Sequence, residues 1–335
     1  MAFGHRLGYL LLWVFLLWVA VLCVATCGAQ PGPERAVAET ASRRDPVRAL
    51  EAVPAAPRLT FLWRATPRGG PHKVVHLLGS IHVASQDFYP LDPSIEEAFA
   101  ASDALAVELD LTEIDPAKVQ TSMVRRALLP AGETLKDRLE AATWERLCAS
   151  LEERKVPLAT VSNFEPWYAA MMLDRIQLKD SGLDPELGVD KYFLDRAGEV
   201  KPIESLETYD DQLDVFDRLA PDLQEWVLVE ALDGLGPEGR DELDRMLAAW
   251  RAGDGAAMDG LIRESLSDEG RTAPLYDALI SRRNAAMAEA IDALADRWDR
   301  LFVVVGAGHL VGDDGLVAIL ERRGYSVTQV AARRR

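Results

Sequence analysis

One short pattern occurs twice in this chain: an apolar run ends at a glycine, and a histidine follows three residues later. The first copy spans residues 74–82 (VVHLLGSIH) and the second spans 301–309 (LFVVVGAGH). Apolar runs rich in β-branched residues and ended by glycine are typical of strands buried on both faces. His82 and His309 should therefore each follow the carboxyl end of a central strand, where open α/β sheets bind ligands. The two copies predict one divided active site.

The spacing alone is not specific. Gly69 and His72 are also three residues apart, but they lie in a Gly/Pro stretch between the strand-like runs 59–66 and 73–78. A hairpin turn is the better interpretation of that stretch. The strand in front of the glycine is what distinguishes the two functional candidates.

The remaining pattern predicts an α/β fold. Six segments have the character of strands: 59–65, 74–78, 104–109, 200–203, 301–305 and 326–330. Asp92 or Ser94 can cap a helix that runs through 101, and Asn163 can cap another. Further helical patterns cover 116–128, 141–155, 164–179, 187–197, 207–219, 223–232, 240–252 and 274–298. We expect a mostly parallel central sheet with helices on both faces and a helical insertion over the active edge.

The N-terminus predicts an extracytoplasmic protein. Residues 7–26 are almost entirely apolar and follow Arg6, so 1–29 is expected to be a signal peptide or an N-terminal membrane anchor. Cys27 leaves lipid attachment as a third alternative. A Pro/Ala-rich linker is expected at 30–57, followed by one α/β hydrolase-like domain at 58–331.

Composition excludes some classes of partner and of stabilisation. The net charge of −17 argues against nucleic acid and against an anionic lipid surface as the main partner. Beyond the N-terminal segment, Cys148 is the single cysteine, so no disulfide framework holds the domain together. Its helical spacing with Trp144, Leu147 and Leu151 favours a buried structural role.

Two acids follow predicted strands. Glu108 comes at the end of the apolar run 104–109, where a charge needs water, a partner or a metal ion. Beside His82 it becomes a candidate metal ligand or general base. Glu207 follows the strand predicted at 200–203, although it could also be a first-turn acid of the next helix. Glu204 is a nearer alternative.

Arg283 lies near the centre of an apolar helical stripe formed by Leu275, Leu279, Met287, Ile291, Leu294 and Trp298. A buried guanidinium requires an acid or an anionic ligand. It could form a structural salt bridge with Glu108 or Glu207, or it could contact a carbonyl or carboxylate of a substrate. Residues 164–172 (FEPWYAAMM) are either core or a pliable wall for a peptide-like substrate.

These residues belong to a longer ordered set of motifs: 78–82 (LGSIH), 107–110 (VELD), 165–167 (EPW), 188–190 (GVD), 206–208 (LET) with Gln212, 283–284 (RN) and 305–312 (VGAGHLVG). Over about residues 58–331 the set resembles the TraB/GumN family, which is related to the Tiki metalloproteases and to the pheromone-shutdown protein PrgY. Ser80 stands where that family usually has threonine. The resemblance implies a divalent-metal peptidase site built from the two histidines and glutamates, with manganese or cobalt as the metal; zinc is also compatible. A more distant similarity is to the erythromycin esterase group, which has no established metal requirement.

The sequence therefore predicts an exported divalent-metal-dependent hydrolase, most simply a peptidase. His82, Glu108 and His309 are the expected metal ligands, Glu207 the general base or a residue that orients a ligand, and Arg283 the group that stabilises an oxyanion or anchors a carboxylate. The roles of the two glutamates can be exchanged. The expected substrate is a peptide or a small ester or amide. Two alternatives stay open: a metal-independent esterase-like hydrolase, and a non-enzymatic protein that sequesters a peptide or takes part in envelope assembly.

Overall fold

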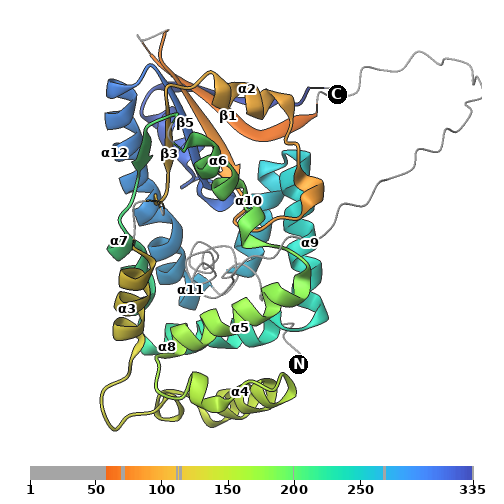
Figure 1. Ribbon diagram of the computed structural model, residues 1–335, viewed down its shortest axis with the longest axis vertical. Coiled ribbons are helices and arrows are strands. Elements are labelled where there is room, and N and C mark those ends of the chain that lie inside the picture. Colours follow the sequence, from red (N-terminus) through yellow and green to blue (C-terminus); the bar gives the residue numbers. More distant parts are fainter. Residues whose placement is uncertain are drawn as a thin grey trace, which may run out of the picture.

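The computed structural model describes residues 58–68, 72–110, 112, 115–198, 200–266 and 269–333. It contains a six-stranded sheet in the order β4-β3-β5-β2-β1-β6. The sheet lies in the upper part of the molecule as seen in Figure 1. The strands are β1 (Leu59–Pro67), β2 (Val74–Ser80), β3 (Ala104–Val107), β4 (Ile203–Ser205), β5 (Arg300–Gly306) and β6 (Tyr325–Ala331). Strands β4, β3, β5 and β2 are mutually parallel, and β1 is antiparallel to both of its neighbours. The predicted α/β class is confirmed.

The connections between parallel strands cover both faces of the sheet. Helices α2 (Pro93–Ala100) and α6 (Val189–Ala197) lie on one face, and α12 (Arg282–Arg297) and α13 (Leu316–Arg322), which contact each other, lie on the other. Phe99 of α2 and Phe193 of α6 both pack on Phe302 of β5, with ring centroids 5.5 and 5.0 Å away. The chain leaves β2 toward β3 and leaves the neighbouring β5 toward β6. This reversal between adjacent strands is a topological switch point, the usual ligand site of such sheets.

A helical layer lies beyond the carboxyl ends of the parallel strands, as predicted (Figure 1). Helices α3 (Pro116–Ala127), α4 (Ala141–Glu153) and α5 (Pro166–Ser181) come from the β3–β4 connection. The β4–β5 connection adds α7 (Tyr209–Asp217), α8 (Pro221–Gly234), α9 (Pro237–Ala252), α10 (Gly255–Ser265) and α11 (Glu269–Tyr276). The indole N–H of Trp250 in α9 donates to the carbonyl of Gly79 at 2.7 Å, which fixes the layer to the end of β2.

The strand predicted at 200–203 is wrong in its boundaries, because β4 begins only at Ile203. Val200 is 78% exposed, and the chain first reaches β3 where the carbonyl of Pro202 accepts the N–H of Leu105. The apolar character of Val200 is therefore not a sign of burial.

Two helix predictions also differ from the structure. Helix α5 begins at Pro166 with Glu165 as its N-cap, not with Asn163, because the carbonyl of Asn163 is used by the N–H of Leu129 in an extended segment. The helix expected at 274–298 is divided into α11, a π-helical segment at Asp277–Ser281, and α12. Helices α10 and α13 were not predicted. In α10, glycines at 255 and 260 weaken the helical signal.

The predicted signal peptide or anchor at 1–29 and the linker at 30–57 lie outside the described residues. Within the part of the chain that the structure describes, no helix combines the length and the apolar character needed to cross a bilayer.

Candidate active site

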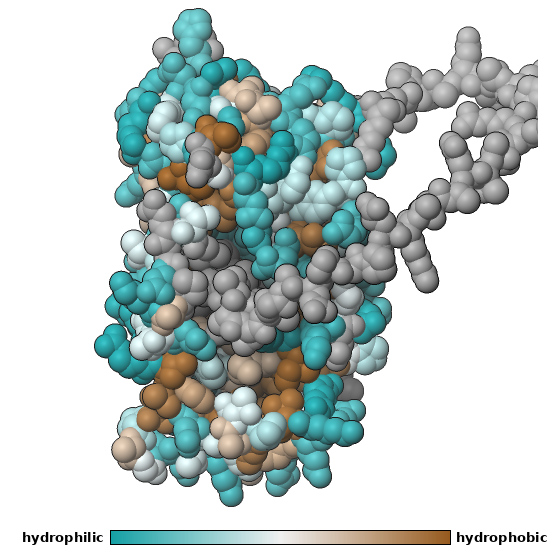
Figure 2. All heavy atoms as spheres, in the orientation of Figure 1, coloured by the Kyte–Doolittle hydropathy of each residue, from teal (hydrophilic) through white to brown (hydrophobic). Residues whose placement is uncertain are grey.

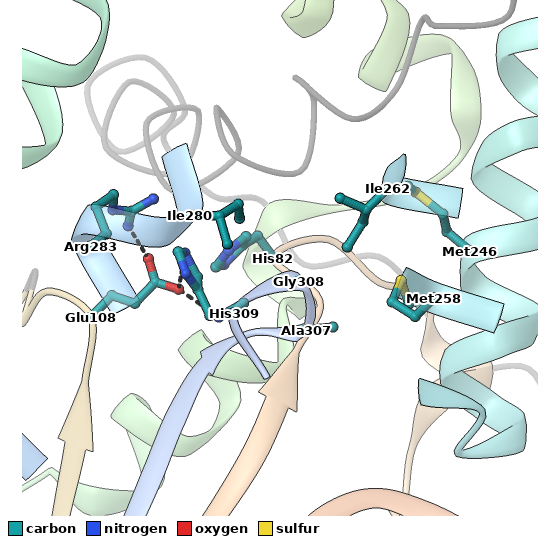
Figure 3. A pocket seen from close by; sticks show the side chains of 11 residues that line it. His82, Glu108, Met246, Met258, Ile262, Ile280, Arg283, Ala307, Gly308 and His309 are labelled. Atoms are coloured by element: carbon teal, nitrogen blue, oxygen red, sulfur yellow. Dashed lines mark hydrogen bonds and ion pairs between the residues drawn. The ribbon is translucent and has the colours of Figure 1, made fainter. Parts of the chain in front are cut away.

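The switch point brings three of the predicted site residues together. His82 follows β2, His309 follows β5 and Glu108 follows β3, and all three side chains are buried. Gly306 is their common neighbour. A Cβ atom built there would lie 3.2 Å from both Glu108 Oε1 and His82 Nε2, and 3.5 Å from His309 Cδ2. The three side chains thus surround one small space, visible in Figure 3.

The tautomer of His309 follows from its contact with Asn284. The amide nitrogen of Asn284 donates to the carbonyls of His309 at 3.2 Å and of Asp314 at 2.6 Å, which fixes Oδ1 as the acceptor end. Since that oxygen lies 2.6 Å from Nδ1 of His309, Nδ1 must carry the proton. Burial, assisted by Arg283, lowers the pKa of His309 to about 3. Its Nε2 therefore presents a lone pair.

A carboxylate takes the corresponding place beside His82. Nδ1 of His82 lies 3.2 Å from Oδ1 of Asp190, although not in hydrogen-bonding geometry. Asp190 is itself held by Ser80, whose hydroxyl donates to Oδ1 at 2.9 Å and accepts the N–H of residue 190 at 3.1 Å. Burial alone would lower the pKa of His82, but Asp190, with help from Glu108, raises it.

Glu108 is held ionised at the centre of the site. Its Oε1 accepts the N–H of Gly306 at 2.5 Å, and its Oε2 accepts Nη2 of Arg283 at 2.7 Å. Burial favours the neutral carboxyl, but the positive charge that His309 carries when protonated, together with that of Arg283, lowers the pKa of Glu108 to about 2. Nε2 of His309 lies 3.8 Å from Oε1.

Glu207 contacts Arg283 and does not line the cavity. Nε and Nη2 of Arg283 donate to its two oxygens at 2.8 and 2.7 Å, and Gln212 donates to Oε2 at 3.2 Å. Glu207 is not a first-turn acid, because α7 begins at Tyr209 with Thr208 as its N-cap. Of the partners predicted for Arg283, the structure therefore shows both glutamates at once.

The space beside these groups is a cavity of about 40 Å³. One side carries His82, Glu108, Arg283 and His309, with Ile280 of the π-helical segment beside His82, and the other side is apolar, formed by Met246 of α9 and by Met258 and Ile262 of α10 (Figure 3). Residues 164–172 do not line it. Trp167 from that stretch is fully buried and stacks on Phe216 instead.

Sequence reasoning missed Asp190 and Asn284 as neighbours of the histidines, and Met246 and Met258 as cavity walls. Asp190 had a usable signal, since it lies next to the helix start at Gly188–Val189 within a recognised motif. Adjacency to Arg283 was the only signal for Asn284. Glu204 is ruled out of the site, because it accepts from Arg297 and Trp298 on the α12 side.

The donor set fits a divalent cation by its chemistry. Nε2 of His82 and the ionised Oε1 of Glu108 lie at the space above Gly306, and Nε2 of His309 is 3.8 Å from that oxygen. Asn284 orients His309 through Nδ1, and Asp190 lies 3.2 Å from Nδ1 of His82; partners at Nδ1 are common for imidazoles in metal sites. In the described ranges no three His, Cys, Asp or Glu side chains already stand in a coordinating arrangement. Holding an ion between these donors would therefore require their side chains to move.

Comparison with known proteins places the chain in a family. The profile of the TraB/PrgY/gumN family matches residues 61–329. The chain belongs to this family. It is 30% identical over 246 residues to the uncharacterized protein YbaP of Escherichia coli K12, covering 73% of this chain and 87% of that protein.

Two relatives carry a metalloprotease name. The "Metalloprotease TIKI homolog" of Amphimedon queenslandica is 24% identical over 324 residues, covering 81% of this chain and 62% of that protein. "Metalloprotease TIKI2" of Danio rerio is 26% identical over 316 residues, with 80% and 60% covered. The chain thus spans less than two thirds of either relative. No solved structure matches it significantly.

Proposed function

We propose that this chain is a divalent-metal-dependent hydrolase that cleaves peptide bonds. One observation carries the proposal. The unprotonated Nε2 of His309 faces the ionised Oε1 of Glu108 at 3.8 Å inside the protein. Two lone pairs that face each other in a site of low dielectric repel unless a cation lies between them. A divalent ion shared by both atoms relieves that repulsion.

The charge balance of the site supports a cation. Glu108 and Glu207 are both buried, and both bind the same guanidinium of Arg283. One positive charge thus serves two carboxylates, and Asp190 adds a third negative group next to His82. Buried charges are costly unless they are compensated, so the site as a whole favours additional positive charge.

In this proposal Nε2 of His82, Nε2 of His309 and Oε1 of Glu108 hold the ion. A bound divalent ion would polarise the scissile carbonyl and lower the pKa of a water molecule. Arg283 keeps Glu108 ionised and oriented, and Glu207 with Gln212 fixes the guanidinium. Glu207 is then a positioning residue, and Glu108 is the carboxylate that lines the cavity.

The names of the relatives support peptide cleavage, and the family resemblance favours manganese or cobalt, with zinc also compatible with the donors. The apolar segment at 7–26 supports action outside the cytoplasm, either after secretion or on a membrane anchor. A peptide is the substrate that fits both features best.

The test begins with protein purified without chelator and analysed for bound metal. Cleavage of a diverse peptide mixture is then measured by mass spectrometry before chelation, after chelation, and after addition of Mn²⁺, Co²⁺ or Zn²⁺. We expect loss of cleavage on chelation and recovery with one of these ions. Cleavage that survives complete metal removal would show a metal-independent hydrolase. No hydrolysis, together with no metal binding, would favour a sequestering protein.

A further inference from the structure

The cavity beside the proposed metal-binding atoms has two chemically different halves. On one side are the imidazoles and Glu108, on the other are Met246, Met258 and Ile262, and Ile280 extends the apolar lining to His82 (Figure 3). These four apolar side chains are each no more than 4% exposed. No other side chain fills the space between this apolar wall and the buried charged groups. The space is therefore available to a group that enters the site.

Two glycines keep the two halves open. A Cβ at Gly306 would approach Glu108 and His82, as described above. A Cβ at Gly308 would instead lie 3.2 Å from Cδ1 of Ile262 and 3.9 Å from Cδ1 of Ile280. The absence of a side chain at 308 therefore preserves space in the apolar half, and its absence at 306 preserves space in the polar half.

The volume of the whole cavity limits what can occupy its apolar half. A cavity of about 40 Å³ holds about three water-sized groups. A group bound there must be attached directly to the reacting carbonyl or amide, because the opposite side of the same small space carries the proposed ligands. A polar group would lack a hydrogen-bond partner on this wall, at a cost in binding free energy. Arg283, the only Lys or Arg among the residues found to line the cavity, is already bound by two carboxylates.

We infer that this wall is a specificity subsite for a short, unbranched apolar side chain next to the scissile bond. The inference rests on the proposed function and names its substrate class: peptides with an unbranched apolar residue such as norvaline or methionine beside the cleaved bond. Methionine side chains are flexible, so Met246 and Met258 can adjust to groups of somewhat different length. Acidic and amide side chains are excluded at this position.

The experiment uses the full-length protein loaded with Mn²⁺ and a series of hydroxamates, from acetohydroxamate to n-hexanohydroxamate, measured by titration calorimetry. The hydroxamate group binds the metal, and its alkyl chain tests the subsite. We expect affinity to increase about fourfold for each added methylene over the first two or three, and then to level off. Gly308→Ala should remove this gain, because the added methyl group takes up space in the apolar half.

Further variants test which residues set the maximum length of the alkyl chain that the subsite accepts. Met246→Ala and Met258→Ala enlarge the cavity and should move the plateau to longer chains, and Met→Leu at the same positions keeps the volume if the alanine variants fail to fold. Met123→Ala is the matched control, because Met123 is equally buried in α3 but does not line the cavity. Peptide cleavage should show short apolar residues enriched beside the cut.

The outcomes separate the two proposals. A series without dependence on chain length, on protein that binds acetohydroxamate, overturns the subsite and leaves the metal hydrolase intact. Unchanged chain-length dependence in Gly308→Ala also overturns it. Failure to bind Mn²⁺ and acetohydroxamate overturns the proposed function, and the subsite with it.

Discussion

The two Gly/His copies have the same spacing but different physical reasons for their glycines. A Cβ at Gly79 would lie 2.4 Å from the ring of Phe61, so this glycine in β2 permits close packing against Phe61 of the neighbouring strand β1. A Cβ at Gly306 would meet Glu108 and His82 instead. The first glycine therefore permits close packing, and the second leaves space between the side chains of the candidate site.

The histidines differ in the same way. His82 is accompanied by the carboxylate of Asp190, which raises its pKa, whereas burial and the charge of Arg283 lower the pKa of His309 and keep it neutral. The two copies of the pattern thus supply two different imidazoles. One lies beside a carboxylate that raises its pKa, and the other stays neutral. A shared spacing in sequence does not imply a shared role.

The largest expected effect is on metal binding when either imidazole is removed. His82→Ala and His309→Ala should each weaken Mn²⁺ binding at least about 100-fold, because each change removes one of the three ligands proposed for the ion. Titration calorimetry measures this. His72→Ala is the control, since His72 has the same spacing from a glycine but lies exposed in the turn between β1 and β2. Equal loss in all three variants would contradict a site formed by the two copies.

Replacing Asp190, the carboxylate beside Nδ1 of His82, should have a smaller effect on Mn²⁺ binding. Asp190→Asn should weaken Mn²⁺ binding about 10- to 100-fold, as expected when a group that orients a ligand is changed. It should also move the pH dependence of binding. Protons compete with the metal for His82, so in the wild type the affinity begins to fall at a pH above 6.5 as the solution is acidified. In Asp190→Asn the pH at which the Mn²⁺ affinity begins to fall should be lower. If that pH does not change, Asp190 does not raise the pKa of His82.

The two histidines should also contribute to stability with opposite pH dependence. Because the folded pKa of His82 is raised, its contribution is complete below pH 6.5 and is lost as the pH rises through the folded pKa. Because the folded pKa of His309 is lowered to about 3, its contribution is present above pH 6.5 and is lost as the pH falls from 6.5 toward 3. Urea unfolding of metal-free protein measures both trends. Asp190→Asn should abolish the first trend and keep the second.

The glycines give the next comparison. Gly79→Ala should lower the free energy of unfolding by about 1–3 kcal/mol through overpacking against Phe61. Gly306→Ala should change stability less but reduce Mn²⁺ affinity about tenfold or more, because its methyl group takes space between the donors. Denaturant unfolding and calorimetry on both variants measure the contrast. If both variants lost stability but kept the wild-type Mn²⁺ affinity, Gly306 would have a structural role like that of Gly79.

The smallest effect concerns Ser80. Ser80→Ala removes the hydroxyl that donates to Asp190 and should weaken Mn²⁺ binding only about three- to tenfold. Ser80→Thr keeps the hydroxyl and restores the usual spelling of the family, so its affinity should stay within about twofold of wild type. A threonine variant as weak as the alanine variant would show that the hydroxyl does not act through Asp190.

Local sequence patterns were sufficient for the strands that carry the site. Apolar runs such as 301–305 have a clear strand signal, and the carboxyl ends of adjacent parallel strands necessarily meet. That geometry is why His82, Glu108 and His309 could be grouped from sequence. Arg283 was also foreseeable as buried and paired, because a charge in an apolar stripe needs an acid.

Contacts set by long-range packing were not foreseeable in this way. Asp190 reaches His82 from the first turn of α6, after a helical excursion of more than 70 residues from β3. Met258 belongs to α10, whose glycines hide its helical character. The π-helical segment Asp277–Ser281 was also not foreseeable, because no local pattern marks it.

The most direct test of the central claim is a crystal structure of the Mn²⁺-loaded protein with anomalous scattering data. The account predicts one ion within about 2.0–2.3 Å of Nε2 of His82, Nε2 of His309 and Oε1 of Glu108, with an open position toward the apolar wall. An ion bound elsewhere, with the two imidazoles not contacting it, would contradict the claim that both Gly/His copies form one metal centre.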